Sequence, residues 1–106
     1  MRTIDAETLR RWLDEGLPVT VLDVRQGDDR AEWSIPGSIH VDAYRALKSG
    51  DPAALAGIDL SADAPVVTVC GMGHASRVAA EQLQARGYRA LSLEGGMRAW
   101  SLAWNA

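Results

Sequence analysis

The sequence is poor in several features, and each shortage excludes a class of protein. It contains one cysteine and no phenylalanine. One cysteine cannot form an internal disulfide, so we expect a reduced thiol and a cytoplasmic location. No stretch approaches the ~18 apolar residues of a membrane-spanning helix. The charged residues that follow Met1 also leave no apolar region of a signal peptide. We therefore expect a protein that does not act in a membrane.

The charge is also too small to indicate a polyanionic partner. The formal net charge is −3, which is the wrong sign for binding nucleic acid. The charge is distributed unevenly along the sequence. From Ala64 onward there are four arginines and only two acidic residues, whereas the first half has an excess of acidic residues. This local excess of arginines favours an anionic ligand near the only thiol, that of Cys70. Scattered surface charge accounts for the same numbers equally well.

What is present fits one small α/β domain over residues 1–106. Of these residues, 47% are hydrophobic, which suits a single modest core. Short apolar runs predict strands at 19–24, 38–41, 64–70 and 88–93. Helical spacing of apolar residues, with glycine stops, predicts helices at 5–16, 75–86 and 97–104. Strands that alternate with helices predict a parallel sheet with helices on both faces.

The remaining segments are less regular. Residues 25–37 are charged and end in Pro36-Gly37, so we expect a loop there. Asp42 and Asp51 are expected to cap two short helices. Trp100 and Trp104 are spaced four apart on one helical face, which is typical of a core-facing stripe.

The stretch around Cys70 is the strongest candidate for chemistry. The cysteine ends an apolar strand, and ligands of parallel α/β proteins bind beyond such carboxyl ends. Gly71 and Gly73 allow backbone N–H groups to point inward, where they can hold an anion. A helix that begins near Ala75 or Ser76 would add its positive end, favouring a thiolate. Cysteine also fills cores as a small hydrophobe, but the flanking glycines favour a reactive thiol.

These motifs resemble those of the rhodanese family of sulfurtransferases. The stretch "VLDVRQGDDRAEWSIPGSIHV" is similar to the family's strand–loop–strand segment, in which Asp-Val-Arg is followed by Ile-Pro-Gly. The stretch "VVTVCGMGHASRVAAEQLQARGYRALSLEGGMRAW" is similar to its active-site strand, loop, helix, final strand and closing Gly-Gly-x-x-x-Trp. The three motifs occur in the family's order over most of the chain.

The resemblance implies a mechanism and a set of site residues. Cys70 would be the nucleophile that takes a sulfane sulfur from thiosulfate or a persulfide and passes it to a thiophilic acceptor. The substrate-binding loop would consist of Gly71, Met72, Gly73, His74, Ala75 and Ser76, with Ser76 able to cap the helix. Asp23, Arg25 and Arg77 would be supporting residues. The resemblance implies no metal and no organic cofactor.

Several residues differ from the family pattern, and one histidine could be mistaken for a catalytic base. Many members carry arginine at the last loop position, where this chain has Ala75, and Arg77 is expected to point elsewhere. Weak binding of a small dianion such as thiosulfate follows from that loss. The usual Gly-His before Ile-Pro-Gly is Trp33-Ser34 here. His74 has no evident orienting carboxylate in the sequence, so we expect a hydrogen-bond donor rather than a general base.

Two other functions compete with turnover of a small sulfur donor. A cysteine-dependent phosphatase needs an arginine at the position of Ser76, where its planar fork would grip the phosphoryl group. A non-turnover sulfur carrier or regulatory module that docks onto a partner enzyme would use the same persulfide. The C-terminal "GGMRAWSLAWN" resembles rhodanese domains that accompany metallo-β-lactamase-fold sulfur enzymes, which makes such an enzyme, or another protein sulfur acceptor, a candidate partner.

Overall fold

The protein folds into a parallel sheet flanked by helices. The computed structural model describes residues 2–104. The strands are β1 (Thr3–Ile4), β2 (Thr20–Asp23), β3 (Ile39–His40), β4 (Val66–Val69) and β5 (Ala90–Leu93). All pairings are parallel, in the order β1-β5-β4-β2-β3. The predicted small α/β fold is therefore confirmed.

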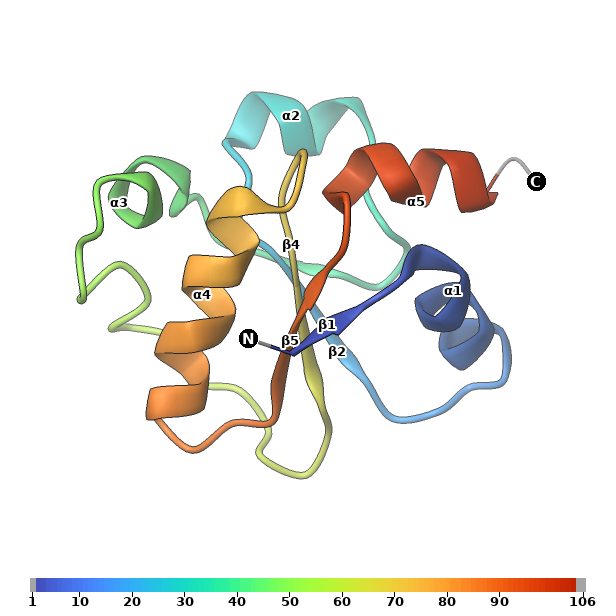
Figure 1. Ribbon diagram of the computed structural model, residues 1–106, viewed down its shortest axis with the longest axis horizontal. Coiled ribbons are helices and arrows are strands. Elements are labelled where there is room, and N and C mark those ends of the chain that lie inside the picture. The colour runs from blue at the N-terminus through green and yellow to red at the C-terminus, as the bar shows by residue number, and fades with distance from the viewer. Residues whose placement is uncertain (1, 105–106) are drawn as a thin grey trace.

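Helices cover both faces of the sheet, as the sequence predicts. They are α1 (Ala6–Asp14), α2 (Gly27–Glu32), α3 (Tyr44–Lys48), α4 (His74–Ala85) and α5 (Gly96–Trp104). In Figure 1, α3 and α4 lie on one side of the sheet and α1 and α5 on the other, with α2 above the end of β4. Within residues 2–104, no helix has the length and apolar character to cross a membrane.

The alternation along β4 decides which way the cysteine points. All four residues of β4 are buried, as expected of a strand covered on both faces. Val66 belongs to the apolar cluster of α3 and α4, whereas Val67 and Val69 belong to that of α1 and α5. Cys70 continues the phase of Val66 and joins the first cluster. Its side chain therefore faces the side that α3 and α4 cover.

The helix α1 begins directly after β1 and is capped by its own sequence. The carboxylate of Asp5 accepts a hydrogen bond of 2.7 Å from the backbone N–H of Thr8. Hydrogen bonding by the Thr8 side chain, followed by this backbone bond, lowers the pKa of Asp5 below its ordinary value of 3.8. Leu9 then packs with Trp100 of α5, and both side chains are fully buried. The predicted core role of Trp100 is confirmed, whereas Trp104 is half exposed against the Trp100 ring.

Three local predictions were wrong. The segment expected to be a loop at 25–37 contains α2, none of whose residues is buried. Asp42 caps no helix, because α3 begins after Ala43 without a side-chain cap, and its carboxylate instead accepts from the N–H of Gly27. Asp51 accepts from the N–H of Ala53, but the residues that follow form turns rather than a helix. The short strand β1 was missed.

Candidate functional site

The thiol of Cys70 lies at the carboxyl end of β4 and accepts hydrogen bonds from two backbone N–H groups. Only 2% of the residue is exposed. Its Sγ accepts hydrogen bonds from the N–H of Gly73 at 3.0 Å and from the N–H of Ser76 at 3.4 Å. Gly73 has a φ of 101°, in the left-handed region that glycine adopts without strain. These N–H groups stabilise negative charge on the sulfur.

Ser76 does not cap α4 as expected, because the helix begins at His74 and its N-cap is Gly73. The Ser76 hydroxyl is buried inside the helix instead. It lies 3.5 Å from the Cys70 sulfur, which can donate to it, and 2.7 Å from the Ser92 hydroxyl. Thr68 donates a 2.6 Å bond to the Ser76 carbonyl oxygen. This polar ladder links β4, α4 and β5 behind the thiol.

The first turn of α5 holds the back of the loop. The N–H of Met97 donates to the Cys70 carbonyl oxygen at 2.8 Å, and the N–H of Arg98 donates to the Gly71 carbonyl oxygen at 3.2 Å. Gly96 makes this approach possible, because a methyl group there would overlap the Cys70 carbonyl oxygen and lie 2.7 Å from the Gly71 carbonyl carbon. The Gly95-Gly96 turn is therefore required for the position of the loop.

A cavity of about 400 Å³ opens in front of the thiol. One wall comes from the loop and the start of α4, and contains Gly71, Met72, His74 and Ala75. Met72 lies at the rim and is 72% exposed. The opposite wall comes from α2 and α3 and contains Asp29, Tyr44 and Lys48. The sequence predictions missed these three residues, since only the tertiary fold brings them to the loop.

Asp23 and Arg25 lie beside this cavity as a buried ion pair. The guanidinium of Arg25 contacts both carboxylate oxygens of Asp23, the shortest distance being 2.8 Å. It also donates a 2.7 Å bond to the Trp33 carbonyl oxygen, and so fixes the segment that follows α2. The Arg25 carbonyl oxygen lies 2.8 Å from Nε2 of His40, so that ring nitrogen carries the proton. The pair thus ties the end of β2 to the rim of the cavity.

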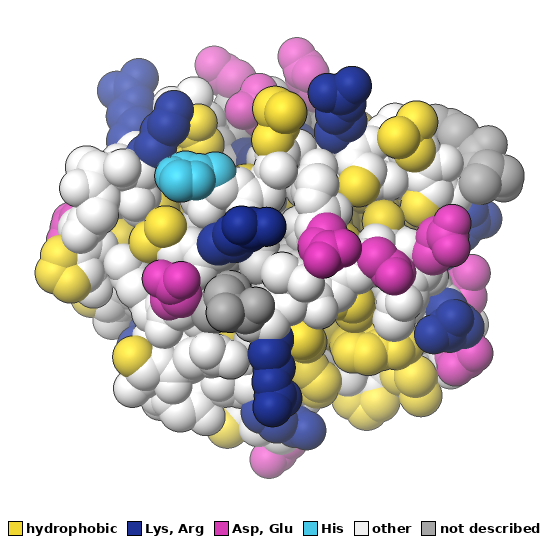
Figure 2. Space-filling model, in the orientation of Figure 1, with side chains coloured by type: hydrophobic (Ala, Val, Ile, Leu, Met, Phe, Trp, Pro, Cys, Tyr) yellow, Lys and Arg dark blue, Asp and Glu magenta, His cyan; other side chains and the backbone are white. Residues whose placement is uncertain are grey.

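The four arginines of the second half do not gather around the thiol. None of them lines the Cys70 cavity. Arg77 lines a separate hollow of about 230 Å³ on the outer side of the loop, together with Glu94. Arg86 and Arg89 donate to backbone carbonyl oxygens far from the loop. Figure 2 likewise shows acidic and basic side chains interspersed over the face it displays.

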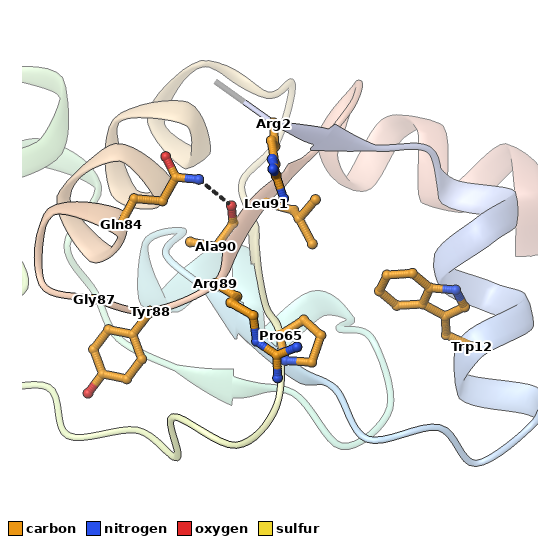
Figure 3. Close-up of a pocket in the computed structure, with 9 residues that line it drawn as sticks. All are labelled: Arg2, Trp12, Pro65, Gln84, Gly87, Tyr88, Arg89, Ala90 and Leu91. Carbon is orange, nitrogen blue, oxygen red and sulfur yellow. Dashed lines mark hydrogen bonds between the residues drawn. The ribbon is translucent and has the colours of Figure 1, made fainter.

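A larger hollow, of about 510 Å³, lies at the amino ends of the strands (Figure 3). Its polar groups include the side chains of Arg2, Gln84 and Arg89, and its apolar walls include Trp12 and Leu91. Its lining contains no cysteine, serine, histidine or carboxylate, and its one hydroxyl, that of Tyr88, accepts a hydrogen bond from the N–H of Leu60. Among residues 2–104, no group of three or more histidine, cysteine or acidic side chains is placed to hold a metal ion. The Cys70 cavity is therefore the candidate active site.

The fold and the site place this chain in a class of small α/β proteins, in which a buried cysteine at the end of a central parallel strand accepts hydrogen bonds from backbone N–H groups. The family model for the rhodanese-like domain matches residues 5–103, and the chain belongs to that family. A rhodanese-related protein of Thermoplasma volcanium has a similar structure, with a TM-score of 0.75, 26% identity, and coverage of 96% of this chain and 92% of that one.

Two curated relatives carry sulfurtransferase names. The thiosulfate sulfurtransferase GlpE of Pseudomonas aeruginosa is 32% identical, and the match covers 97% of this chain and 86% of that protein. The Mycobacterium tuberculosis protein named "Probable adenylyltransferase/sulfurtransferase MoeZ" is also 32% identical, but the match covers 93% of this chain and only 24% of that protein. The relatives thus support the general class of sulfurtransferases.

Proposed function

We propose that this protein is a sulfurtransferase that carries a sulfane sulfur on Cys70. The observation that carries the proposal is the pair of N–H donors, from Gly73 and Ser76, directed at Sγ. These groups favour the thiolate, which is the nucleophile in sulfur transfer. The loop from Gly71 to Ser76 is then the substrate-binding loop, while Asp23 and Arg25 are positioning residues.

The proposed reaction has two half-reactions. The Cys70 thiolate attacks the outer sulfur of thiosulfate, a new sulfur–sulfur bond forms, and sulfite leaves with the electron pair of the broken bond. The resulting persulfide anion then gives its outer sulfur to an acceptor. With cyanide, the products are thiocyanate and the Cys70 thiolate. The loop N–H groups compensate the negative charge that Cys70 bears in both states.

A carrier role is the second candidate, supported by the partial match to MoeZ. In that relative the matched part is about a quarter of the protein, so a domain of this type occurs there beside others. Here Cys70 would be loaded once and would deliver its sulfur to a partner protein. A phosphatase role lacks support, because Ser76 stands where the phosphate-gripping arginine would be needed. We expect no hydrolysis of an aryl phosphate.

Intact mass spectrometry tests the proposal. After incubation with thiosulfate, the protein should gain one sulfur atom, and cyanide should remove it with release of thiocyanate. Cys70→Ser should show neither change. Repeated turnover with cyanide would favour the enzyme, whereas a single loading that only a partner protein discharges would favour the carrier. Turnover of thiosulfate by the serine variant would overturn the proposal.

A further inference from the structure

Two oppositely charged side chains line the Cys70 cavity without ion-pair partners. Asp29 of α2 and Lys48 of α3 are both exposed members of the wall opposite the loop. Within residues 2–104, the carboxylate of Asp29 makes no hydrogen bond or ion pair, and the Lys48 ammonium contacts no carboxylate. Lys48 is instead held 5.4 Å from the centre of the Tyr44 ring. Both charges are therefore available to a molecule in the cavity.

The other charges near the cavity are already compensated or lie elsewhere. Arg25 is paired with the buried carboxylate of Asp23, which also lies 3.6 Å from the guanidinium of Arg30. Asp28 and Arg45, neighbours of Asp29 and Lys48 on the same two helices, line a different hollow beside Asp42. His74, on the loop wall, is the remaining titratable side chain of the cavity besides Tyr44 and the thiol. The cavity thus presents one unpaired negative and one unpaired positive charge.

We propose that Asp29 and Lys48 select a zwitterionic sulfur donor, namely the persulfide of a thiol that bears both an ammonium and a carboxylate group. Cysteine persulfide is the simplest molecule of this class. The inference rests on the proposed function, since it assigns the donor of the same Cys70 site. Lys48 would bind the donor's carboxylate, and Asp29 would bind its ammonium group.

The size of the cavity agrees with an organic donor. A volume of about 400 Å³ falls within the range of small-molecule sites, and a thiosulfate ion would fill only a small part of it. A compact dianion would also meet the carboxylate of Asp29, which repels it. An amino-acid persulfide can instead place its outer sulfur toward Cys70 and its charged groups toward α2 and α3, which lie at the carboxyl end of the sheet (Figure 1).

The transfer step balances without any further reactant. The Cys70 thiolate attacks the outer, protonated sulfur of R–S–SH, and a sulfur–sulfur bond to Cys70 forms. The bond between the two donor sulfurs breaks, and R–S⁻ leaves with its electron pair. The proton stays on the transferred sulfur, so the products are the Cys70 persulfide and one thiolate.

Four persulfides that share the reacting group but differ in charge provide the test. They derive from cysteine, 3-mercaptopropionate, cysteamine and 2-mercaptoethanol, and so carry both charges, the carboxylate alone, the ammonium alone, or neither. The rate of Cys70 loading, followed by intact mass, should be highest for cysteine persulfide. Because exposed charge pairs contribute about 1 kcal/mol or less each, we expect a preference of about three- to tenfold over the uncharged donor, mainly in KM.

Single variants should separate the two charges. Lys48→Met should slow loading only from the two donors with a carboxylate, and Asp29→Asn only from the two with an ammonium group. Arg45→Met and Asp28→Asn are the matched controls, since these residues sit on the same helices but outside the cavity. The controls should leave the order of the four donors unchanged.

The outcomes distinguish this inference from the proposed function. Equal loading by all four persulfides, unaltered in Lys48→Met and Asp29→Asn, would overturn the selection by charge while leaving the sulfurtransferase intact. A failure of every donor, thiosulfate included, to load Cys70 would instead overturn the proposed function. A preference for the carboxylate-only donor that Asp29→Asn does not alter would show that Lys48 alone selects the donor. That result would contradict the proposed selection of a zwitterionic persulfide.

Discussion

The β1–α1 and β4–α4 junctions place different hydrogen-bond acceptors at equivalent points. After β1, the Asp5 carboxylate accepts from the N–H three residues further on, at Thr8. After β4, the Cys70 sulfur accepts from the N–H three residues further on, at Gly73, and also from Ser76. Both junctions place the positive end of a helix against a side chain. A hydrogen bond of this kind to Asp5 favours the charged form of the carboxyl group.

The difference between the junctions lies in what surrounds the accepting side chain. Asp5 is exposed and serves only its own helix. Cys70 is buried at the end of a cavity and is enclosed from behind by α5. A helix start is thus common to both sites, whereas the second layer of contacts and the cavity occur only at β4. Substitutions in these contacts and in the cavity should therefore impair the proposed sulfur transfer.

The largest effect should come from Gly96→Ala. The residue has a φ of 56°, and an added methyl group would overlap the Cys70 carbonyl oxygen. Left-handed backbone and overpacking together should lower the free energy of unfolding by about 3 kcal/mol or more. Gly87→Ala, with a φ of 95° but open space around it, should lose only about 1–2 kcal/mol. Urea denaturation measures both, and equal losses would contradict the role assigned to α5.

Ala75→Arg should alter donor choice by a smaller amount. Ala75 lines the cavity, so an arginine there would extend into the space in front of the thiol. A charged contact to thiosulfate of about 1.4 kcal/mol would raise kcat/KM about tenfold, mainly through KM. A bulkier organic persulfide would lose space and should gain nothing. A sub-millimolar thiosulfate KM in the unaltered protein, on the order of a typical enzyme's, would show that the arginine is unnecessary.

Ser76→Ala should test the polar ladder behind the thiol. It removes the hydroxyl near Sγ but retains the N–H that donates to the sulfur. The loss of one buried hydrogen bond should cost about 1 kcal/mol of stability. Ser92→Ala is the control, since it breaks the same 2.7 Å contact without touching the sulfur. We expect similar melting temperatures for the two variants but slower sulfur loading only in Ser76→Ala.

The smallest effect should come from Asp5→Asn, at the β1–α1 junction, which has no cavity. Because the folded-state pKa of Asp5 is lowered, its cap stabilises the protein above pH 3.8 and loses this effect as the pH falls through the folded value. Asp5→Asn should therefore be less stable than the unaltered protein near neutral pH, and the difference should shrink in acid. Sulfur loading of Cys70 should not change. A stability difference that grew on acidification would refute the capping role.

The sequence was a good guide wherever a feature is local. Apolar runs predicted the sheet, and the glycines after Cys70 predicted inward N–H groups, because both depend on neighbouring residues. The helix α2 was missed because it is exposed on every side and shows no apolar period. Ser76 was expected to cap, but burial among Thr68 and Ser92 gives its hydroxyl other partners.

The opposite wall of the cavity could not have been predicted in the same way. Asp29 and Lys48 lie far from Cys70 along the chain and belong to short helices of ordinary composition. They meet the loop only because α2 and α3 fold over the carboxyl end of the sheet. The basic excess of the second half was misleading for the same reason, since Arg86 and Arg89 bond to distant carbonyl oxygens and Arg77 lines a separate hollow.

The two hydrogen bonds from α5 to the loop also orient the peptide dipoles around the thiol. Met97 and Arg98 engage the carbonyl oxygens of Cys70 and Gly71 from behind. The electron-rich ends of these two peptide groups are thereby turned outward, while donors from Gly73 and Ser76 point inward. The loop is a polarised shell, electropositive on its inner surface, although no cationic side chain contributes to it. Any anion formed on the sulfur would be stabilised mainly by backbone N–H groups, which a side-chain substitution does not remove.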